Sequence, residues 1–288
     1  MARRPGPRAL TVLSAQAAPV PWDAPASLDK LERLVRTYRR ALPHVDLYLF
    51  PELFVTGEDP WTRGPAEYLE TVAEPVPGPL TERLAAVARR TRRWLSPGSI
   101  AERVGPRVYN TALLFDPAGE LVLRYRKVFP WVPFEEVERG TEAPPVIRVP
   151  GVGRLGVLIC YDGWFPEMAR GLAFRGAEAI LHPTLTTTAD REQELVLARA
   201  NAIANQCYVL NVNAVPSVGG GRSIGVDPHG RVLFELGTEE GFAVETLHLD
   251  VVRDARERGT RGMNRVLEHA RNAPPAVFRA ARPPREAR

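Results

Sequence analysis

The sequence is poor in cysteine and has no long hydrophobic run. Cys160 and Cys207 are its only cysteines among 288 residues, too few for the disulfide framework of a small secreted domain. No apolar stretch approaches the roughly 20 residues that a membrane-spanning helix needs. The basic start, MARRPGPRAL, is not followed by the apolar run of about 7–15 residues that a secretory signal contains. We therefore expect a cytoplasmic protein without a membrane segment.

The charge pattern disfavours nucleic acid as a partner. The net charge is +4, but the basic residues are scattered and aromatic side chains are not interleaved with them. The cysteines and the five histidines show no metal-ligand spacing, so neither a metal nor another cofactor is expected. The composition is that of an ordinary globular domain, and no linker is visible inside it. We place one domain over residues 8–258 and a C-terminal extension over 259–288.

Lysine is also scarce. Of the 38 basic residues only Lys30 and Lys127 are lysines, and the other 36 are arginines. Where the surface simply needs positive charge, this chain uses arginine. Lys127 is therefore a candidate for a task that suits a compact ammonium better than a planar guanidinium, such as approaching a single oxyanion. A solvated charge in a loop is the alternative for Lys127.

Hydrophobic periodicity predicts alternating strands and helices, which is typical of α/β layers. Strands are expected over 9–15, 45–50, 108–115, 121–125, 154–160, 179–182, 207–213, 223–226 and 232–236. Helices are expected over 28–42, 79–94, 166–175 and 190–205. Ser27 is predicted to cap the first of these helices, and Asp190 with Gln193 forms the expected capping box of the last.

Two predicted hairpins share one turn sequence. Both turns, 116–119 and 227–230, read Asp-Pro-x-Gly, and they fall in different halves of the chain. This repetition hints at a duplicated architecture, with two sheets face to face and helices outside. The residues after 258 show little periodicity and contain two Pro-Pro pairs, so we expect an extended tail there.

Cys160 is the candidate nucleophile. It ends a predicted strand and is followed by a sharp turn into a helix. On such an elbow a nucleophile is exposed at the sheet edge, and the next backbone N–H groups point to where an oxyanion forms. A buried structural cysteine is the alternative for this segment taken alone. Cys207 has no elbow and is interpreted as structural.

A thiol nucleophile needs a base. Among the histidines only His182, at the end of a predicted strand, could face a site, so a Cys–His pair has little support. Glu52 lies within an apolar stretch, where desolvation would raise its pKa and suit it to general-base catalysis. The alternative for Glu52 is an exposed charge at a strand end.

Three segments together resemble the nitrilase superfamily of carbon–nitrogen hydrolases. They are Pro51-Glu52, Tyr125-Arg126-Lys127 and the run CYDGWFPE over 160–167, in that order. The segment 199–209 is similar to the helix–strand stretch that this family places after its nucleophile. The resemblance covers residues 8–255 and implies an α/β fold with four layers, an αββα sandwich.

The resemblance also implies the site. Glu52 would be the general base, Lys127 would hold the oxyanion, and Cys160 would be the nucleophile. The aliphatic-amidase and formamidase branch has a Lys-x-x-Pro-Trp-x-Pro-x-Glu pattern, which assigns a second catalytic glutamate to Glu135, with Glu136 as the other register. The implied substrate-binding residues are Trp131 as a pocket wall, Tyr161 through its backbone N–H, and Thr184.

The implied reaction is hydrolysis of a small linear amide through an acyl-enzyme on cysteine, with release of ammonia or an amine. The nucleophile is followed by Tyr161-Asp162, where true nitrilases have Trp-Glu, so nitriles are disfavoured. An N-carbamoyl-amine or N-carbamoyl-amino-acid hydrolase would use the same residues and stays as the alternative. A noncatalytic binding protein on this fold is the rival from another class, but no triad member is missing.

The resemblance further implies a homodimer or a higher homo-oligomer. In such an assembly the C-terminal segments reach over the partner. Residues 259–275 would then be ordered only through that contact, and Arg282–Arg288 would stay mobile.

Overall fold

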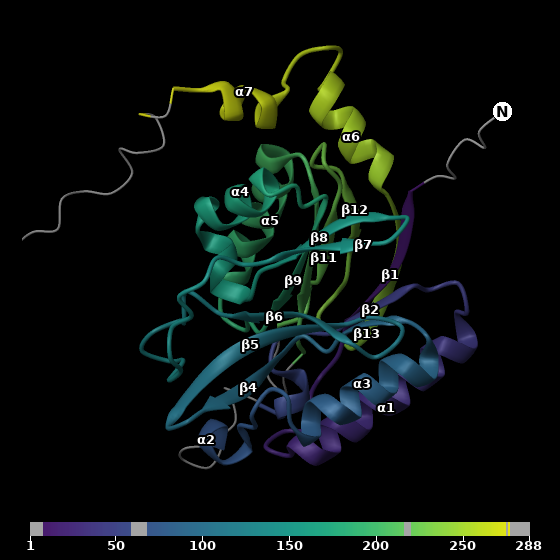
Figure 1. The fold of residues 1–288 in the computed structure, drawn as a ribbon, viewed down its shortest axis with the longest axis vertical. Helices are drawn as coiled ribbons and strands as arrows, with labels where there is room; N and C mark the ends of the chain where they lie inside the picture. Colours follow the sequence, from purple (N-terminus) through teal and green to yellow (C-terminus); the bar gives the residue numbers. More distant parts are fainter. Residues whose placement is uncertain (1–7, 59–67, 216–219, 275, 277–288) are drawn as a thin grey trace, which may run out of the picture.

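Two β-sheets packed face to face form the centre of the protein (Figure 1). The computed structural model describes residues 8–58, 68–215, 220–274 and 276. The first sheet has the strand order β13-β1-β2-β3-β5-β4, with β6 paired to β5. Its strands are β1 (Ala9–Gln16), β2 (Leu47–Leu49), β3 (Trp94–Ser96), β4 (Ser99–Val104), β5 (Arg107–Phe115), β6 (Leu121–Arg126) and β13 (Gly241–His248).

The second sheet has the strand order β12-β11-β10-β9-β8-β7. Its strands are β7 (Val146–Val149), β8 (Gly153–Val157), β9 (Ala179–Thr184), β10 (Tyr208–Asn213), β11 (Ile224–Val226) and β12 (Val232–Glu235). The central strands β8, β9 and β10 are parallel and the outer ones antiparallel. Each sheet is therefore mixed, with crossover connections in its middle and hairpins at its edge.

Helices cover the outer faces of both sheets. Helices α1 (Ala24–Ala41) and α3 (Pro79–Thr91) pack on the first sheet, and α4 (Pro166–Phe174) and α5 (Arg191–Asn205) pack on the second, on opposite sides of the molecule in Figure 1. The predicted four-layer αββα sandwich is confirmed. The remaining elements are α2 (Tyr68–Val72), α6 (Leu249–Arg258), α7 (Val266–Asn272) and the 3-10 turns η1 (Phe54–Thr56) and η2 (Cys160–Trp164).

The core consists of three layers of apolar side chains, and β1 shows how alternation assigns them. Leu10 and Val12 point into the layer between the two sheets, whereas Leu13 and Ala15 point toward α1 and α3. All four side chains are at most 1% exposed. Because successive strand residues face opposite sides, a central strand of a sandwich is apolar on both faces. This explains the continuous apolar runs in the sequence.

Both predicted hairpins are confirmed, and both use the same turn. Strand β5 pairs antiparallel with β6 after the turn at Asp116, and β11 pairs antiparallel with β12 after the turn at Asp227. In each turn one carboxylate oxygen of the aspartate accepts two backbone N–H groups, two and four residues further on. The aspartate therefore replaces backbone partners that the turn residues would otherwise lack.

Three local predictions are wrong. The cap of α1 is Asp23, whose side chain accepts the Ala26 N–H at 2.9 Å, while Ser27 is buried and bonds to Val20 instead. Asp190 stands at the N-cap of α5, but no side-chain cap hydrogen bond is formed there. The segment after 258 is not extended throughout, because Val266–Asn272 forms helix α7.

Helix α7 packs against α4, α5 and α6 of its own chain. The backbone N–H of Leu267 donates to the buried Gln206 side chain at 2.9 Å, which ties α7 to the end of α5. Contacts within the same chain therefore hold α7 in place. The tail Arg282–Arg288 lies outside the described residues.

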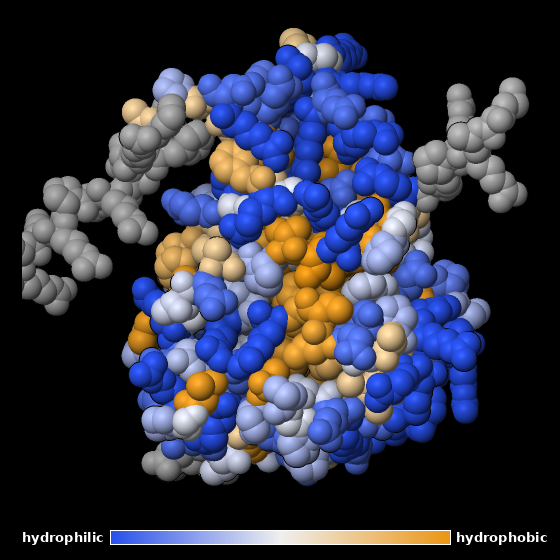
Figure 2. Space-filling model, viewed as in Figure 1, coloured by the Kyte–Doolittle hydropathy of each residue, from blue (hydrophilic) through white to orange (hydrophobic). Residues whose placement is uncertain are grey.

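Most of the face seen in Figure 2 is hydrophilic, with an apolar band across its middle. The band lies over the strands between the two helix layers, where no helix covers the sheets in this view. Within the described part of the chain, no helix is long and apolar enough to cross a membrane.

Candidate active site

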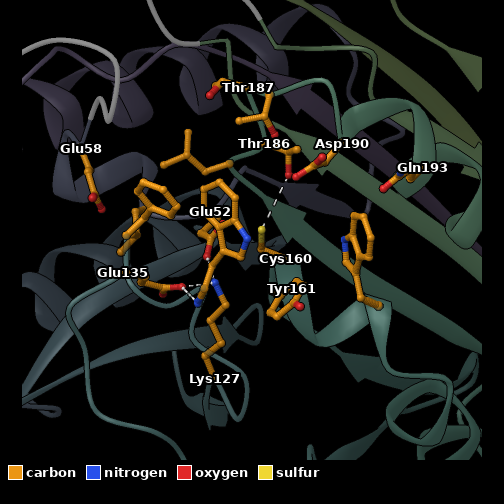
Figure 3. Close-up of a pocket in the computed structure, with 16 residues that line it drawn as sticks. Glu52, Glu58, Lys127, Glu135, Cys160, Tyr161, Thr186, Thr187, Asp190 and Gln193 are labelled. Atoms are coloured by element: carbon orange, nitrogen blue, oxygen red, sulfur yellow. Dashed lines mark hydrogen bonds and ion pairs between the residues drawn. The ribbon is translucent and has the colours of Figure 1, made fainter.

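The candidate catalytic residues come from both sheets and meet at the seam between them. Glu52 follows strand β2 and Lys127 follows β6, both in the first sheet, whereas Cys160 follows β8 in the second. All three line one pocket, together with Glu135 (Figure 3). The sandwich therefore assembles residues that lie far apart in the sequence.

Lys127 lies between two carboxylates. Its side chain is 1% exposed, and its Nζ donates to Glu52 Oε1 at 2.9 Å and to Glu135 Oε2 at 2.5 Å. The backbone N–H of Trp131 also donates to Glu135 Oε2, at 2.9 Å, which holds that carboxylate over the lysine. Glu136 is exposed and outside the pocket, so the structure brings Glu135, and not Glu136, to the lysine.

Asn110 completes this cluster and was missed by sequence reasoning. Its Nδ2 donates at 2.8 Å to Glu52 Oε1 and at 2.8 Å to Glu135 Oε1, so one amide group bridges the two glutamates. Asn110 lies within strand β5 and is fully buried. An amide side chain in the middle of a predicted strand was the available signal, because a buried polar group needs a partner.

Cys160 occupies a strained backbone position. Its φ angle is +42°, in the left-handed region that side chains other than glycine rarely adopt. The residue begins the turn η2 shortly after β8, which ends at Val157, so the strand is shorter than predicted but the expected strand-to-turn elbow is present. Its Sγ lies 3.7 Å from Thr186 Oγ1 and faces the pocket (Figure 3).

His182 lies behind the nucleophile. Its Nε2 is 2.9 Å from the carbonyl oxygen of Cys160, and Asn211 Nδ2 is 3.1 Å from its Nδ1. A carbonyl can only accept, so Nε2 carries the proton and Nδ1 accepts from the amide. Burial lowers the pKa of His182, which is consistent with this neutral form. His182 therefore fixes the backbone of Cys160 and is not placed to deprotonate its thiol.

Gly163 leaves the space that this histidine occupies. A Cβ on Gly163 would lie 2.3 Å from His182 Cε1, far inside van der Waals contact. The Gly163 carbonyl in turn accepts from Asn201 Nδ2 of α5 at 2.8 Å. The glycine in the CYDG motif is thus explained by the close approach of the imidazole.

Asp162 connects the elbow to the lysine segment. It is fully buried, and burial raises its pKa to about 6. Its two oxygens accept four hydrogen bonds of 2.8–3.2 Å, from the Tyr125 hydroxyl and the backbone N–H groups of Val128, Phe129 and Ile159. One carboxylate therefore holds the segments that carry Lys127 and Cys160 in register. The sequence did not show that Asp162 has this bracing role.

The protonation states follow from burial and from the close charges. Burial alone would lower the pKa of Lys127, but the carboxylates of Glu135 and Glu52 outweigh it, and the pKa is raised. Burial, and then the Glu52 carboxylate, raises the pKa of the Cys160 thiol, so the resting sulfur keeps its proton. Burial also raises the pKa of Glu52, which makes it a stronger proton acceptor than an exposed carboxylate.

The pocket encloses about 230 Å³. Trp131 and Tyr161, predicted as substrate-binding residues, both line it. Thr184 does not: it is fully buried and its hydroxyl donates to Asn213 Oδ1 at 3.0 Å. Thr186, two residues further along, lies against the sulfur instead. Residues two apart in a strand point to the same face of the sheet. Thr184 is still inside strand β9, however, whereas Thr186 lies beyond its end and can reach the pocket.

Among the residues that the structure describes, no group of three or more His, Cys, Asp or Glu side chains is placed to hold a metal ion. The pocket presents a thiol, a carboxylate that can act as a base, and an ammonium with a carboxylate on each side.

Comparison with known proteins agrees with this geometry. Residues 11–257 match the carbon–nitrogen hydrolase family. The chain belongs to this family, within the nitrilase superfamily. Formamidases of Bacillus cereus and Bacillus anthracis are 37% identical over 204 residues, which cover 68% of this chain. That match spans 59% of the length of these curated relatives.

Solved structures of the superfamily share the fold. Nit3 of Saccharomyces cerevisiae superimposes with a TM-score of 0.78 at 26% identity, over 87% of this chain and 94% of its own. An amidase from Nesterenkonia sp. superimposes with a TM-score of 0.72 at 29% identity, over 93% and 97%. One variant of the latter has been solved with butyramide, with a TM-score of 0.71 at 30% identity over 93% and 97%.

Proposed function

We propose that this chain hydrolyses the C–N bond of small linear amides through a thioester on Cys160. The observation that carries the proposal is the buried Lys127 ammonium, held between Glu52 and Glu135 at the wall of the pocket that Cys160 faces. A thiol nucleophile, a base that can deprotonate it and a fixed cation for the oxyanion together suit this site to acyl transfer through cysteine.

In the first half-reaction Glu52 takes the thiol proton as the sulfur attacks the amide carbon. The ammonium of Lys127 has three donors, and within the described part of the chain two of them are used by the carboxylates. The third is available for the oxyanion that develops on the substrate oxygen, together with the backbone N–H of Tyr161. Each such donor contributes about 3 kcal/mol to lowering the barrier. Glu52 then passes its proton to the leaving ammonia.

In the second half-reaction water cleaves the thioester. Glu52 accepts a proton from the water, and the Cys160 thiol is restored. Asn110 keeps the two carboxylates of Glu52 and Glu135 at fixed positions on either side of the ammonium. Glu135 thereby orients the lysine and offers a second acceptor for the attacking water.

The pocket favours an amide over an N-carbamoyl amino acid. A substrate carboxylate calls for a basic partner, and among the described residues that line the pocket only Lys127 is basic. That lysine already forms ion pairs with Glu52 and Glu135. The relatives point the same way, because they include formamidases and an amidase solved with butyramide.

Release of ammonia from a panel of short alkyl amides, N-carbamoyl compounds and nitriles tests the proposal. We expect the amides to react fastest and Cys160→Ala to abolish the reaction. An acyl adduct on Cys160, detected by intact mass after rapid acid quench, would show the thioester directly. Faster turnover of N-carbamoyl acids or nitriles would refute the amide assignment, and turnover by the Cys160→Ala variant would refute the mechanism.

A further inference from the structure

Glu58 is a pocket residue that the mechanism does not use. It follows Glu52 by six residues, after the turn η1 and Gly57. Gly57 has a φ angle of +79°, and a Cβ there would lie 2.9 Å from the Val20 carbonyl oxygen, so this turn requires glycine. The turn brings Glu58 to the pocket wall on the side of Glu135 (Figure 3). Its position is therefore fixed by the fold.

One carboxyl oxygen of Glu58 lacks a hydrogen-bond partner among the described residues. This atom, Oε2, is buried. Burial, with the nearby carboxylates of Glu135 and Glu52, raises its pKa to about 8, against the opposing effect of Lys127. Among the described residues, Tyr68 is a further titratable group on which the charge of Glu58 acts. Buried polar groups in folded proteins almost always have a partner, so an unpartnered carboxyl in a binding pocket indicates that the ligand supplies one.

The charge of the pocket selects that ligand. Among the described residues that line it, the four acids Glu52, Glu58, Glu135 and Asp190 face the single base Lys127. No arginine in the described part of the chain lines the pocket. Even while Glu58 holds its proton, one ammonium cannot neutralise the other three carboxyl groups, so the pocket attracts positive charge and repels negative charge.

Aromatic rings strengthen this preference. Trp131 and Phe134 line the same pocket, with ring centroids 4.9 Å apart, and so do Tyr161 and Trp164, at 5.8 Å. The faces of such rings attract an ammonium or guanidinium group. The backbone N–H of Trp131 also donates to Glu135, and Glu135 lies on the same side of the pocket as Glu58 in Figure 3.

We propose that Glu58 forms a subsite for a cationic group of the substrate, a primary ammonium or a guanidinium, carried at the end of the amide opposite the scissile bond. This inference rests on the proposed function and adds a substrate class to it. When the cation binds, the Glu58 carboxyl gives up its proton and forms an ion pair. A neutral alkyl amide leaves the carboxyl protonated and without a partner.

The test compares amides of equal size and different charge. The pair 4-aminobutanamide and pentanamide has the same shape, and shorter and longer ω-amino and alkyl amides extend it. We expect the wild type to prefer the ω-amino amide in kcat/KM at the best chain length. Glu58→Gln should reduce that preference about tenfold or more, because it replaces a charge partner by a neutral amide. Glu136→Gln, the same substitution at an exposed site beside the pocket, should keep the wild-type preference.

The pH dependence of the preference gives a second readout. The ratio of the two kcat/KM values cancels the titration of the catalytic cluster, which both substrates share. In the wild type this ratio should rise as the pH approaches 8, where free Glu58 ionises. In Glu58→Gln it should be flat over the same range. A ratio near one in the wild type, or one that Glu58→Gln leaves unchanged, overturns the subsite.

Binding separates this inference from the proposed function. Calorimetry with the Cys160→Ala variant measures affinity for the two amides without turnover. Tighter binding of 4-aminobutanamide, lost in the Cys160→Ala/Glu58→Gln double variant, supports the subsite even if the wild type released no ammonia. Equal affinity for both amides, with normal ammonia release by the wild type, refutes the subsite and leaves the amidase assignment standing.

Discussion

Lys127→Arg is the sharpest test of the proposed oxyanion role, because it preserves the charge and changes only the shape. The lysine is 1% exposed and its Nζ lies 2.9 Å and 2.5 Å from two carboxylates, so a wider guanidinium must displace one of them. Overpacking of this kind costs about 1–3 kcal/mol of stability. Loss of one positioned oxyanion donor lowers kcat by about 10²–10³-fold. We expect both effects, with a smaller change in KM.

Lys30→Arg is the matched control, since Lys30 is the other lysine of the chain. It pairs with Glu240 at 2.6 Å near the surface, and such pairs contribute at most about 1 kcal/mol. Ammonia release under saturating amide gives kcat, and urea unfolding gives stability. Lys30→Arg should match the wild type in both. If Lys127→Arg kept kcat within about threefold of the wild type, a guanidinium would hold the oxyanion as well as an ammonium does. The proposed role of the compact lysine ammonium would then be wrong.

Three further outcomes follow from the structure. Iodoacetamide should modify Cys160 before Cys207, since Cys160 lines the pocket whereas Cys207 is fully buried; peptide mass mapping gives the order. Glu58→Gln should gain stability relative to the wild type as the pH rises from about 4.5 toward 8. The folded carboxyl holds its proton more tightly than the unfolded one, so ionisation costs the folded state up to about 1.4 kcal/mol per pH unit, measurable by urea unfolding at pH 5 and pH 8. Gly163→Ala should displace His182, lower kcat by about tenfold or more and cost about 1–3 kcal/mol.

Each of these has a contrary result that would count against it. Faster modification of Cys207 would remove the nucleophile assignment. A stability difference between Glu58→Gln and the wild type that did not change with pH would mean that the carboxyl is hydrated. For Gly163→Ala the control is Gly171→Ala in α4, where the nearest atom to a new Cβ is 3.6 Å away, on the flexible Arg175. That change should stabilise the helix by about 0.5–1 kcal/mol, and equal behaviour of the two variants would refute the steric argument.

Sequence reasoning located the strands and helices with strong periodicity, and it missed those without it. The long apolar runs became β1, β5, β9 and β10 because a strand between two layers is buried on both faces. The short strand β3 and the partly exposed β13 carry no clear pattern and were not predicted. The C-terminal helix α7 was missed because its stability comes from packing on Gln206 and its neighbours, which local sequence does not show.

By itself the sequence nominated three of the groups that line the pocket. The scarcity of lysine pointed to Lys127, the elbow pattern to Cys160, and the apolar setting to Glu52, and their order along the chain carried the family resemblance; all three line one pocket. These inferences could be made from the sequence because they depend on local features, namely residue type, neighbours and spacing.

The tertiary structure alone decided how these groups are held and what else surrounds them. Asn110 bridges the two glutamates from the middle of a strand, Asp162 braces the elbow, and Thr186 takes the place predicted for Thr184. Glu58 reaches the pocket only because of the turn at Gly57. Each of these contacts joins segments that are distant in sequence or depends on where a strand ends. Such contacts are fixed by the packing of the two sheets, which no local pattern encodes.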